Sequence, residues 1–135
     1  MNLNCVIIDD EPLAQELLKS YVEKTPILNL IGVYSNPILA MKDLVGKGTI
    51  HLMFLDIQMP GLNGLEYSKL VDSKTRIVFT TAFSQYAVDS YKVNALDYLL
   101  KPISYTDFMQ SVNKAVKWFE MLEKCKYPSE SLSTD

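Results

Sequence analysis

HLMFLDIQMPGLNG, residues 51–64 of this chain of 135 residues, is the most informative segment for predicting the fold. It begins with an apolar run of strand length, residues 51–55, and passes through Asp56 into a turn that contains proline and glycine. A strand that is apolar along its whole length is covered on both faces, which is typical of parallel sheets. The stretch therefore predicts a buried parallel strand that ends on a carboxylate.

The same kind of apolar run occurs on either side of this stretch, separated by segments with helical spacing. The helical segments open with good start signals, at Glu11-Pro12, Asn36-Pro37, Asn63 and Ser84. Five strands alternating with helices predict an α/β fold, a doubly wound sandwich around a five-stranded parallel sheet with right-handed crossovers. The five apolar runs are residues 3–8, 28–34, 51–55, 76–80 and 97–100.

The last helix is predicted over residues 106–124, with one apolar stripe that faces the core. After Cys125 the chain loses this periodicity and gains proline and serine, which indicates the start of a linker. We therefore expect one domain over residues 1–125 and an interdomain linker over residues 126–135. The stripe consists of Phe108, Val112, Ala115, Val116, Phe119 and Leu122.

Composition narrows the class of protein. The formal net charge is -3, with 48% hydrophobic residues, and the basic residues form no run that would neutralise a row of phosphates. No segment approaches the roughly 18 apolar residues that cross a bilayer, so a cytoplasmic protein is expected. The two cysteines lack the spacing of a zinc or redox motif, and Cys5 is predicted to be a core residue.

Carboxylates stand at the ends of two of the predicted strands. Asp9 and Asp10 close the first run, and Asp56 closes the third. Ligands of doubly wound sheets bind at the carboxyl ends of the strands, so these side chains converge if the two strands are neighbours. Their mutual repulsion calls for a cation, and Mg²⁺ fits because it takes one or two carboxylates, a carbonyl and waters while leaving room for phosphoryl oxygens.

Two further polar residues end later strands of the series. Thr81 follows the fourth run and Lys101 follows the fifth. A hydroxyl and an ammonium group facing a carboxylate and Mg²⁺ suit phosphoryl transfer, which is catalysed mainly by positioning and charge neutralisation. Asp56 is the expected nucleophile. Thr80 is the alternative to Thr81, since strand alternation sends one hydroxyl inward and the other toward the site.

Together, Asp9-Asp10, Asp56 with its MPGLNG loop, Thr81-Ala82 and Lys101-Pro102 resemble the receiver domain of two-component response regulators over nearly the whole chain. The resemblance implies a flavodoxin-like (βα)5 fold and phosphorylation of Asp56 by a sensor histidine kinase. It also implies that Asp10 ligates Mg²⁺ directly, that Asp9 assists through water, and that the main-chain carbonyl of Gln58 completes the protein ligands. Thr81 and Lys101 would bind the phosphoryl group, and the bond between Lys101 and Pro102 would be cis.

The resemblance also implies a switch. Thr81 would move toward the phosphoryl group and Tyr98, on the fifth strand, would rotate inward behind it. The face formed by the fourth helix, fifth strand and fifth helix would then form a homodimer. Phe83, two residues beyond Thr81, would border the phosphoryl group and hinder the attack of water. Gly61 and Gly64 are taken as turn residues of the loop after Asp56.

The amino-acid sequences of three segments resemble, more specifically, receivers of LytTR-type (LytR/AlgR) regulators. The segments are DEPLA at residues 10–14, DIQMPGLNGLE at residues 56–66, and residues 81–103. Such regulators carry a C-terminal LytTR DNA-binding domain, so DNA would be bound only through a domain that lies outside this chain.

Two alternatives to that role remain. One is a stand-alone receiver that acts as a phosphorelay carrier or protein-binding module. The other is an aspartate-based phosphatase of the haloacid dehalogenase kind, which has a second aspartate where this chain has Gln58. We expect no enzyme activity beyond self-phosphorylation and slow self-dephosphorylation.

Overall fold

Strands and helices alternate along the chain in the computed structural model, which describes residues 1–83 and 94–126. The helix predicted to start near Ser84 lies outside the described residues, so the labels pass from α3 to α5. The elements are β1 (Leu3–Ile8), α1 (Pro12–Glu23), β2 (Leu28–Tyr34), α2 (Pro37–Asp43), β3 (Leu52–Asp56), α3 (Gly64–Ser68), β4 (Arg76–Thr81), β5 (Asp97–Leu100) and α5 (Tyr105–Lys126).

The five strands form one parallel sheet in the order β2-β1-β3-β4-β5. This is the flavodoxin-like order, and it confirms the predicted fold. The order changes direction at β1, which lies between β2 and β3, so the carboxyl ends of β1 and β3 are neighbours at the switch point. That neighbourhood is the condition on which the predicted convergence of Asp9 and Asp56 depended.

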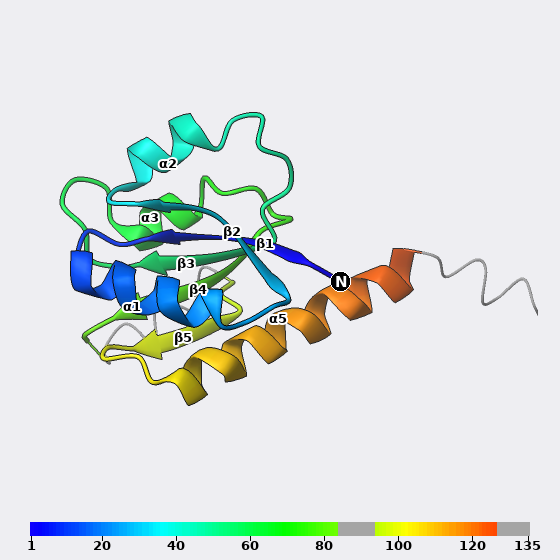
Figure 1. Ribbon diagram of the computed structural model, residues 1–135. Helices are drawn as coiled ribbons and strands as arrows, with labels where there is room; N and C mark the ends of the chain where they lie inside the picture. Colours follow the sequence, from blue (N-terminus) through cyan, green and yellow to red (C-terminus); the bar gives the residue numbers. More distant parts are fainter. Residues whose placement is uncertain (84–93, 127–135) are drawn as a thin grey trace, which may run out of the picture.

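Helices cover both faces of the sheet. In Figure 1, α1 and α5 lie on one face, and α2 and α3 lie on the other. Alternate strand residues point to opposite faces, so Phe54 packs with Phe108 of α5, whereas its neighbour Leu55 belongs to the core beneath α2 and α3. Each such buried side chain stabilises the fold by about 1.5–3 kcal/mol relative to exposure.

The predicted helix starts follow from local chemistry. Pro12 and Pro37 stand in the first turns of α1 and α2, where a missing amide hydrogen costs nothing. The Asn36 side chain accepts a hydrogen bond from the Leu39 amide at 2.9 Å, and the Asn63 side chain accepts one from the Leu65 amide at 2.6 Å. Both asparagines therefore cap free amide groups at the helix ends.

The prediction for α5 was wrong at its end. Leu122 is 50% exposed, although four of the other stripe residues are buried and Val116 is partly buried. The four are Phe108, Val112, Ala115 and Phe119. The helix continues past the edge of the sheet, so its last turns have no core to face (Figure 1). Cys5 is buried, as predicted. Among residues 1–83 and 94–126, no helix is long and apolar enough to span a bilayer.

Candidate functional site

The candidate site lies where β1, β3 and β5 end. Asp9 directly follows β1, Asp56 is the last residue of β3, and Lys101 directly follows β5. The Lys101 ammonium nitrogen lies 2.9 Å from Asp9 Oδ2 and 3.5 Å from Asp56 Oδ2. Asp9 and Lys101, which are 92 positions apart in the sequence, thus meet at one rim of the sheet. They do so because all strands of a parallel sheet end on the same side.

Asp9 is fully buried and held in a fixed orientation. Its amide donates to the Tyr34 carbonyl at 3.0 Å, and its Oδ1 accepts from the Glu11 amide at 2.9 Å. Its Oδ2 forms an ion pair with Lys101 but has no contact with the geometry of a hydrogen bond. One carboxylate oxygen is therefore used by the fold, and the other faces the site.

Asp56 is 3% exposed, and its environment disfavours the charged form. Burial and then the charge of Asp9 raise its pKa from 3.8 to about 7, and the close Asp10 carboxyl adds to this. The Lys101 charge and a 3.3 Å hydrogen bond from the Gln58 amide act in the opposite direction but do not outweigh these effects. The ionised form of Asp56 is therefore disfavoured in this environment even with Lys101 beside it.

Lys101 is the cation at the centre of this group. Burial lowers its pKa, but the contacts with Glu11, Asp9 and Asp56 outweigh burial and raise the pKa above its usual value. The ammonium group therefore stays charged. Its shortest ion pair is with Glu11, at 2.8 Å, but the Glu11 side chain is 63% exposed, so solvent screens that pair.

Glu11 is the site residue that the sequence analysis missed. Carboxylate oxygens of Asp9, Glu11 and Asp56 all lie within 4.8 Å of one another, and Asp10 is not part of this group of three. Glu11 was assigned only to the start of α1. Its position directly after the acidic pair at the end of β1 was the available signal, because a residue there remains at the rim of the sheet.

The donor set fits a hard divalent cation. All of the converging groups are carboxylates, which are oxygen ligands of the kind that Mg²⁺ prefers. These three carboxylates face one ammonium group, that of Lys101, and the charge of Asp9 is, after burial, the second cause of the raised pKa of Asp56. A divalent cation would remove this repulsion, and Lys101 alone does not.

Thr80 and Thr81 both reach the site end of β4, and both are buried. Thr80 pairs with Asp56 across the sheet, and its hydroxyl has no hydrogen-bond partner in the described part of the chain. Thr81 Oγ1 accepts from the Phe83 amide at 3.1 Å, and the Thr81 carbonyl accepts from the Lys101 amide at 2.7 Å. The main chain thus ties the end of β4 to the end of β5.

Phe83 connects Thr81 with Tyr98. The amide of Phe83 donates to the Thr81 hydroxyl oxygen, and its carbonyl accepts from the Tyr98 hydroxyl. The Phe83 side chain is 44% exposed at the rim. The bond between Lys101 and Pro102 is cis.

The loop after β3 is held close to Asp56. Gly61 has a φ of +87°, which confirms a turn that favours glycine. Gly64 has a different role from the predicted one, because a Cβ there would lie 2.2 Å from the Asp56 carbonyl oxygen. Its amide donates to the Ile57 carbonyl at 2.8 Å. Gly64 therefore allows the start of α3 to pack directly on the main chain that carries Asp56.

Comparison with known proteins identifies relatives. A family model described as response regulator receiver domain matches residues 5–113. The transcriptional regulatory protein BtsR of Escherichia coli is 40% identical over 108 residues, which is 75% of this chain and 43% of that protein. An uncharacterized response regulatory protein of Vibrio vulnificus is 37% identical over 117 residues, 85% of this chain and 48% of that protein. The chain thus spans less than half the length of these relatives.

Solved structures show the same architecture. The response regulatory domain of mrkE from Klebsiella pneumoniae superposes with a TM-score of 0.79 at 27% identity, covering 88% of this chain and 99% of that one. The receiver domain of AraT, a response regulator from Geobacillus stearothermophilus, has a TM-score of 0.81 at 22% identity, covering 92% of this chain and 100% of that one. The second likeness is evidence for the fold alone.

Proposed function

This chain belongs to the response regulator receiver domain family, and we propose that it accepts a phosphoryl group on Asp56 from a sensor histidine kinase. The observation that carries the proposal is the buried Asp56 carboxylate, which lies 3.5 Å from the Lys101 ammonium nitrogen within a group of carboxylates. An oxygen of Asp56 attacks the phosphorus of a phosphohistidine, and a P–O bond replaces the P–N bond. The imidazole leaves with the electron pair of that bond and takes up a proton from solvent.

We propose Mg²⁺ as the cofactor. Asp10, Asp56 and the main-chain carbonyl of Gln58 hold it, and Asp9 assists through water. Asp9 Oδ1 already accepts from the Glu11 amide, which leaves Oδ2 as the oxygen that faces the site. When bound, the ion offsets negative charge on the phosphoryl oxygens and on the attacking carboxylate. Glu11 is an additional candidate ligand because it lies within the same group.

Lys101 and Thr81 bind the transferred group in this proposal. Lys101 is 14% exposed in its side chain and already faces Asp56, so a short movement away from Glu11 brings its ammonium group to the phosphoryl oxygens. Thr81 donates its hydroxyl to the same group. No separate metabolic substrate is turned over, so the chemistry consists of self-phosphorylation and slow self-hydrolysis.

The proposed switch runs through Thr81, Phe83 and Tyr98. Because Phe83 is hydrogen-bonded to both other residues, a movement of Thr81 toward the phosphoryl group alters the contact that holds Tyr98. Tyr98 then turns inward and the face of helix 4, β5 and α5 dimerises. Helix 4 lies outside the described residues, so β5 and α5 are the described part of this face.

The output of the whole protein is proposed to be transcription control through a C-terminal LytTR DNA-binding domain. The match covers 43% of BtsR, which is named a transcriptional regulatory protein. The unmatched part of BtsR is long enough to form a second domain. On this proposal residues 1–125 form the receiver, residues 126–135 begin the linker, and the protein is cytoplasmic. A complete reading frame that ends soon after α5 would instead favour the stand-alone carrier.

Phosphorylation is tested by mass spectrometry. The chain is incubated with Mg²⁺ and acetyl phosphate, and the added phosphoryl mass is located by peptide mapping. We expect one phosphoryl group on the peptide with Asp56, and none in Asp56→Asn or after chelation of Mg²⁺. Mass on another residue, or mass that persists in Asp56→Asn, contradicts the proposal. The exposed Glu16→Gln, which changes the charge equally, serves as the control variant.

A further inference from the structure

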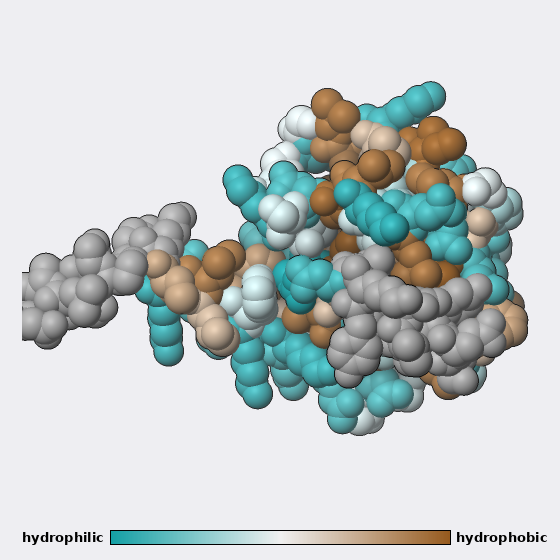
Figure 2. Space-filling model, turned by 180° about the vertical axis from the view of Figure 1, so that it is seen from behind, coloured by the Kyte–Doolittle hydropathy of each residue, from teal (hydrophilic) through white to brown (hydrophobic). Residues whose placement is uncertain are grey.

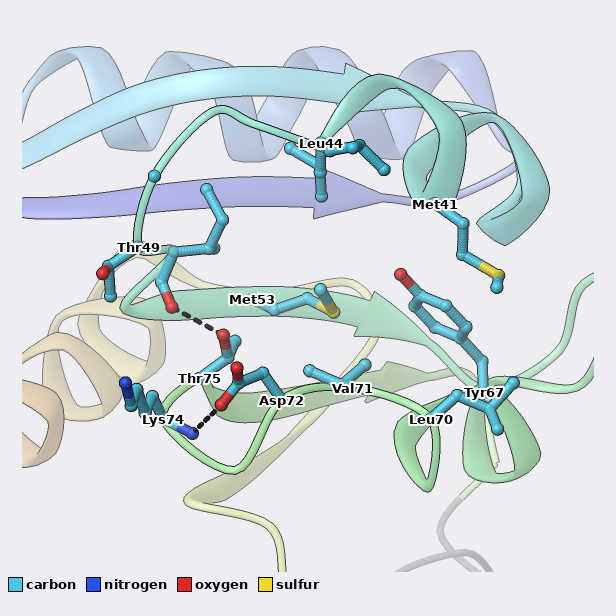
Figure 3. Close-up of a pocket in the computed structure, with 13 residues that line it drawn as sticks. Met41, Leu44, Thr49, Met53, Tyr67, Leu70, Val71, Asp72, Lys74 and Thr75 are labelled. Carbon is cyan, nitrogen blue, oxygen red and sulfur yellow. Dashed lines mark hydrogen bonds between the residues drawn. The ribbon is translucent and has the colours of Figure 1, made fainter.

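A hollow in the surface lies away from the acidic site, on the face of the sheet that carries α2 and α3. It has a volume of about 510 Å³ and is enclosed by α2, the segment that leads into β3, α3 and the segment that leads into β4 (Figure 3). Its floor consists of Ile50, Met53 and Tyr67, which are 8%, 2% and 4% exposed. Pockets for small ligands have volumes of about 300–1,000 Å³, so the hollow has the size for one small molecule.

The rim of the hollow is apolar and open to solvent. Met41, Val45 and Leu70 are 45%, 80% and 64% exposed. Figure 2 shows hydrophobic side chains gathered on the part of this face near α2. An apolar molecule seated on Met53 would cover these side chains and remove their surface from water.

One polar group faces into the hollow without a partner. The Tyr67 hydroxyl points into the hollow, toward Met53 (Figure 3), and no described residue hydrogen-bonds it. The Tyr34 hydroxyl, which interacts electrostatically with Tyr67, is already bonded to Asp43. Tyr67 as a whole is 4% exposed, but its hydroxyl is open to the hollow, so it can donate to an acceptor atom of a molecule bound there.

Two other polar side chains at the edge of the hollow bond to nearby main-chain groups. The Thr75 hydroxyl donates to the Ile50 carbonyl at 2.6 Å, and the Asp72 side chain accepts from the Lys74 amide at 2.8 Å (Figure 3). These bonds close one end of the hollow. A ligand is therefore oriented by the Tyr67 hydroxyl and held by apolar contact elsewhere.

We propose that this pocket binds a small apolar molecule with one hydrogen-bond acceptor, which takes the hydrogen bond of the Tyr67 hydroxyl. The site is separate from the acidic cluster, because none of the residues that line it belongs to that cluster. Binding does not depend on phosphorylation of Asp56.

The test uses two probes of similar shape. Acetophenone has an acceptor carbonyl beside an aromatic ring, and ethylbenzene lacks the carbonyl. Each is titrated into the ¹⁵N-labelled chain and followed by amide chemical shifts. We expect both probes to shift the amides of Ile50, Met53 and Tyr67, with acetophenone binding more tightly.

Tyr67→Phe removes only the hydroxyl and is expected to weaken acetophenone binding about five- to tenfold, the effect of one hydrogen bond, while ethylbenzene binding stays the same. Tyr105→Phe, which removes a hydroxyl on α5, is the matched control and leaves both affinities unchanged. Equal affinity of Tyr67→Phe for acetophenone overturns the proposal. It is also overturned if neither probe shifts these amides but raising the protein concentration does, since the hollow is then a contact between copies of the chain.

Discussion

Replacing Asp56 by asparagine should stabilise the metal-free protein at neutral and alkaline pH. The pKa of Asp56 is raised from 3.8 to about 7, first by burial and then by the charge of Asp9. A folded-state pKa above the unfolded value means that the folded chain holds the proton more tightly, so stability falls as pH rises from about 4 to about 7. Asparagine has nearly the same shape and no charge, so Asp56→Asn removes this loss.

The size of the effect follows from the shift. Each pKa unit corresponds to about 1.4 kcal/mol, so a shift of roughly three units gives an upper limit of about 4 kcal/mol above pH 7. Relaxation around the charged carboxylate reduces this limit. We expect the stability advantage of Asp56→Asn over the wild type to grow by about 2–3 kcal/mol as the pH rises from about 5 to about 8. The side chain is 4% exposed, so little of the effect is screened by solvent.

The assay is urea unfolding in a chelating buffer across this pH range, for the wild type, Asp56→Asn and the exposed control Glu16→Gln. Saturating Mg²⁺ is expected to bring the wild type close to Asp56→Asn, because a bound cation offsets the charge. Parallel pH profiles for the wild type and Asp56→Asn in chelator would contradict a raised pKa of Asp56, since the carboxyl would then ionise without a cost in stability.

Three further outcomes are expected. Gly64→Ala should lower the free energy of unfolding by about 2–3 kcal/mol, because the new Cβ would lie 2.2 Å from the Asp56 carbonyl oxygen; Gly46→Ala, with a φ of +80° but open space, should cost only about 1 kcal/mol in the same urea titration. Equal losses would show that α3 moves away freely. Phe83→Ala should speed dephosphorylation of the acyl phosphate, because water would reach the phosphoryl group more easily. An unchanged rate of phosphate release would contradict a shielding role of Phe83. Glu11→Gln should weaken Mg²⁺ binding by about two- to fivefold in an amide-shift titration, and unchanged affinity would remove Glu11 from the ligand set.

The fold could be predicted from the sequence because its strands are continuously apolar and helices α1, α2 and α3 begin with proline or a capping asparagine. Residues 28–34 and 97–100 were predicted with the bounds that the structure has for β2 and β5. Leu122 was misassigned because helical periodicity continues in the sequence after the sheet has ended. Periodicity reports which side of a helix is apolar, but it does not report how far the neighbouring layer extends.

The site could be predicted only in part from the sequence. Strand ends in a parallel sheet locate Asp9, Asp56 and Lys101 on one rim, so their proximity follows from topology. The position of Glu11 after the acidic pair places it at the same rim. Its ion pair with Lys101 depends in addition on how the chain turns into α1, which that position does not predict. The same limit applies to Gly64, since its packing on Asp56 is a tertiary contact that resembles an ordinary turn residue in the sequence.

Whether Asp56 is the phosphoryl acceptor can be observed in a crystal structure of the chain with Mg²⁺ and beryllofluoride, a mimic of the phosphoryl group. We expect beryllium bonded to a carboxylate oxygen of Asp56, one Mg²⁺ beside it, and the Lys101 ammonium group shifted from Glu11 to a fluoride. Beryllofluoride bonded to a different carboxylate, or absent while Mg²⁺ occupies the acidic cluster, would contradict Asp56 as the acceptor.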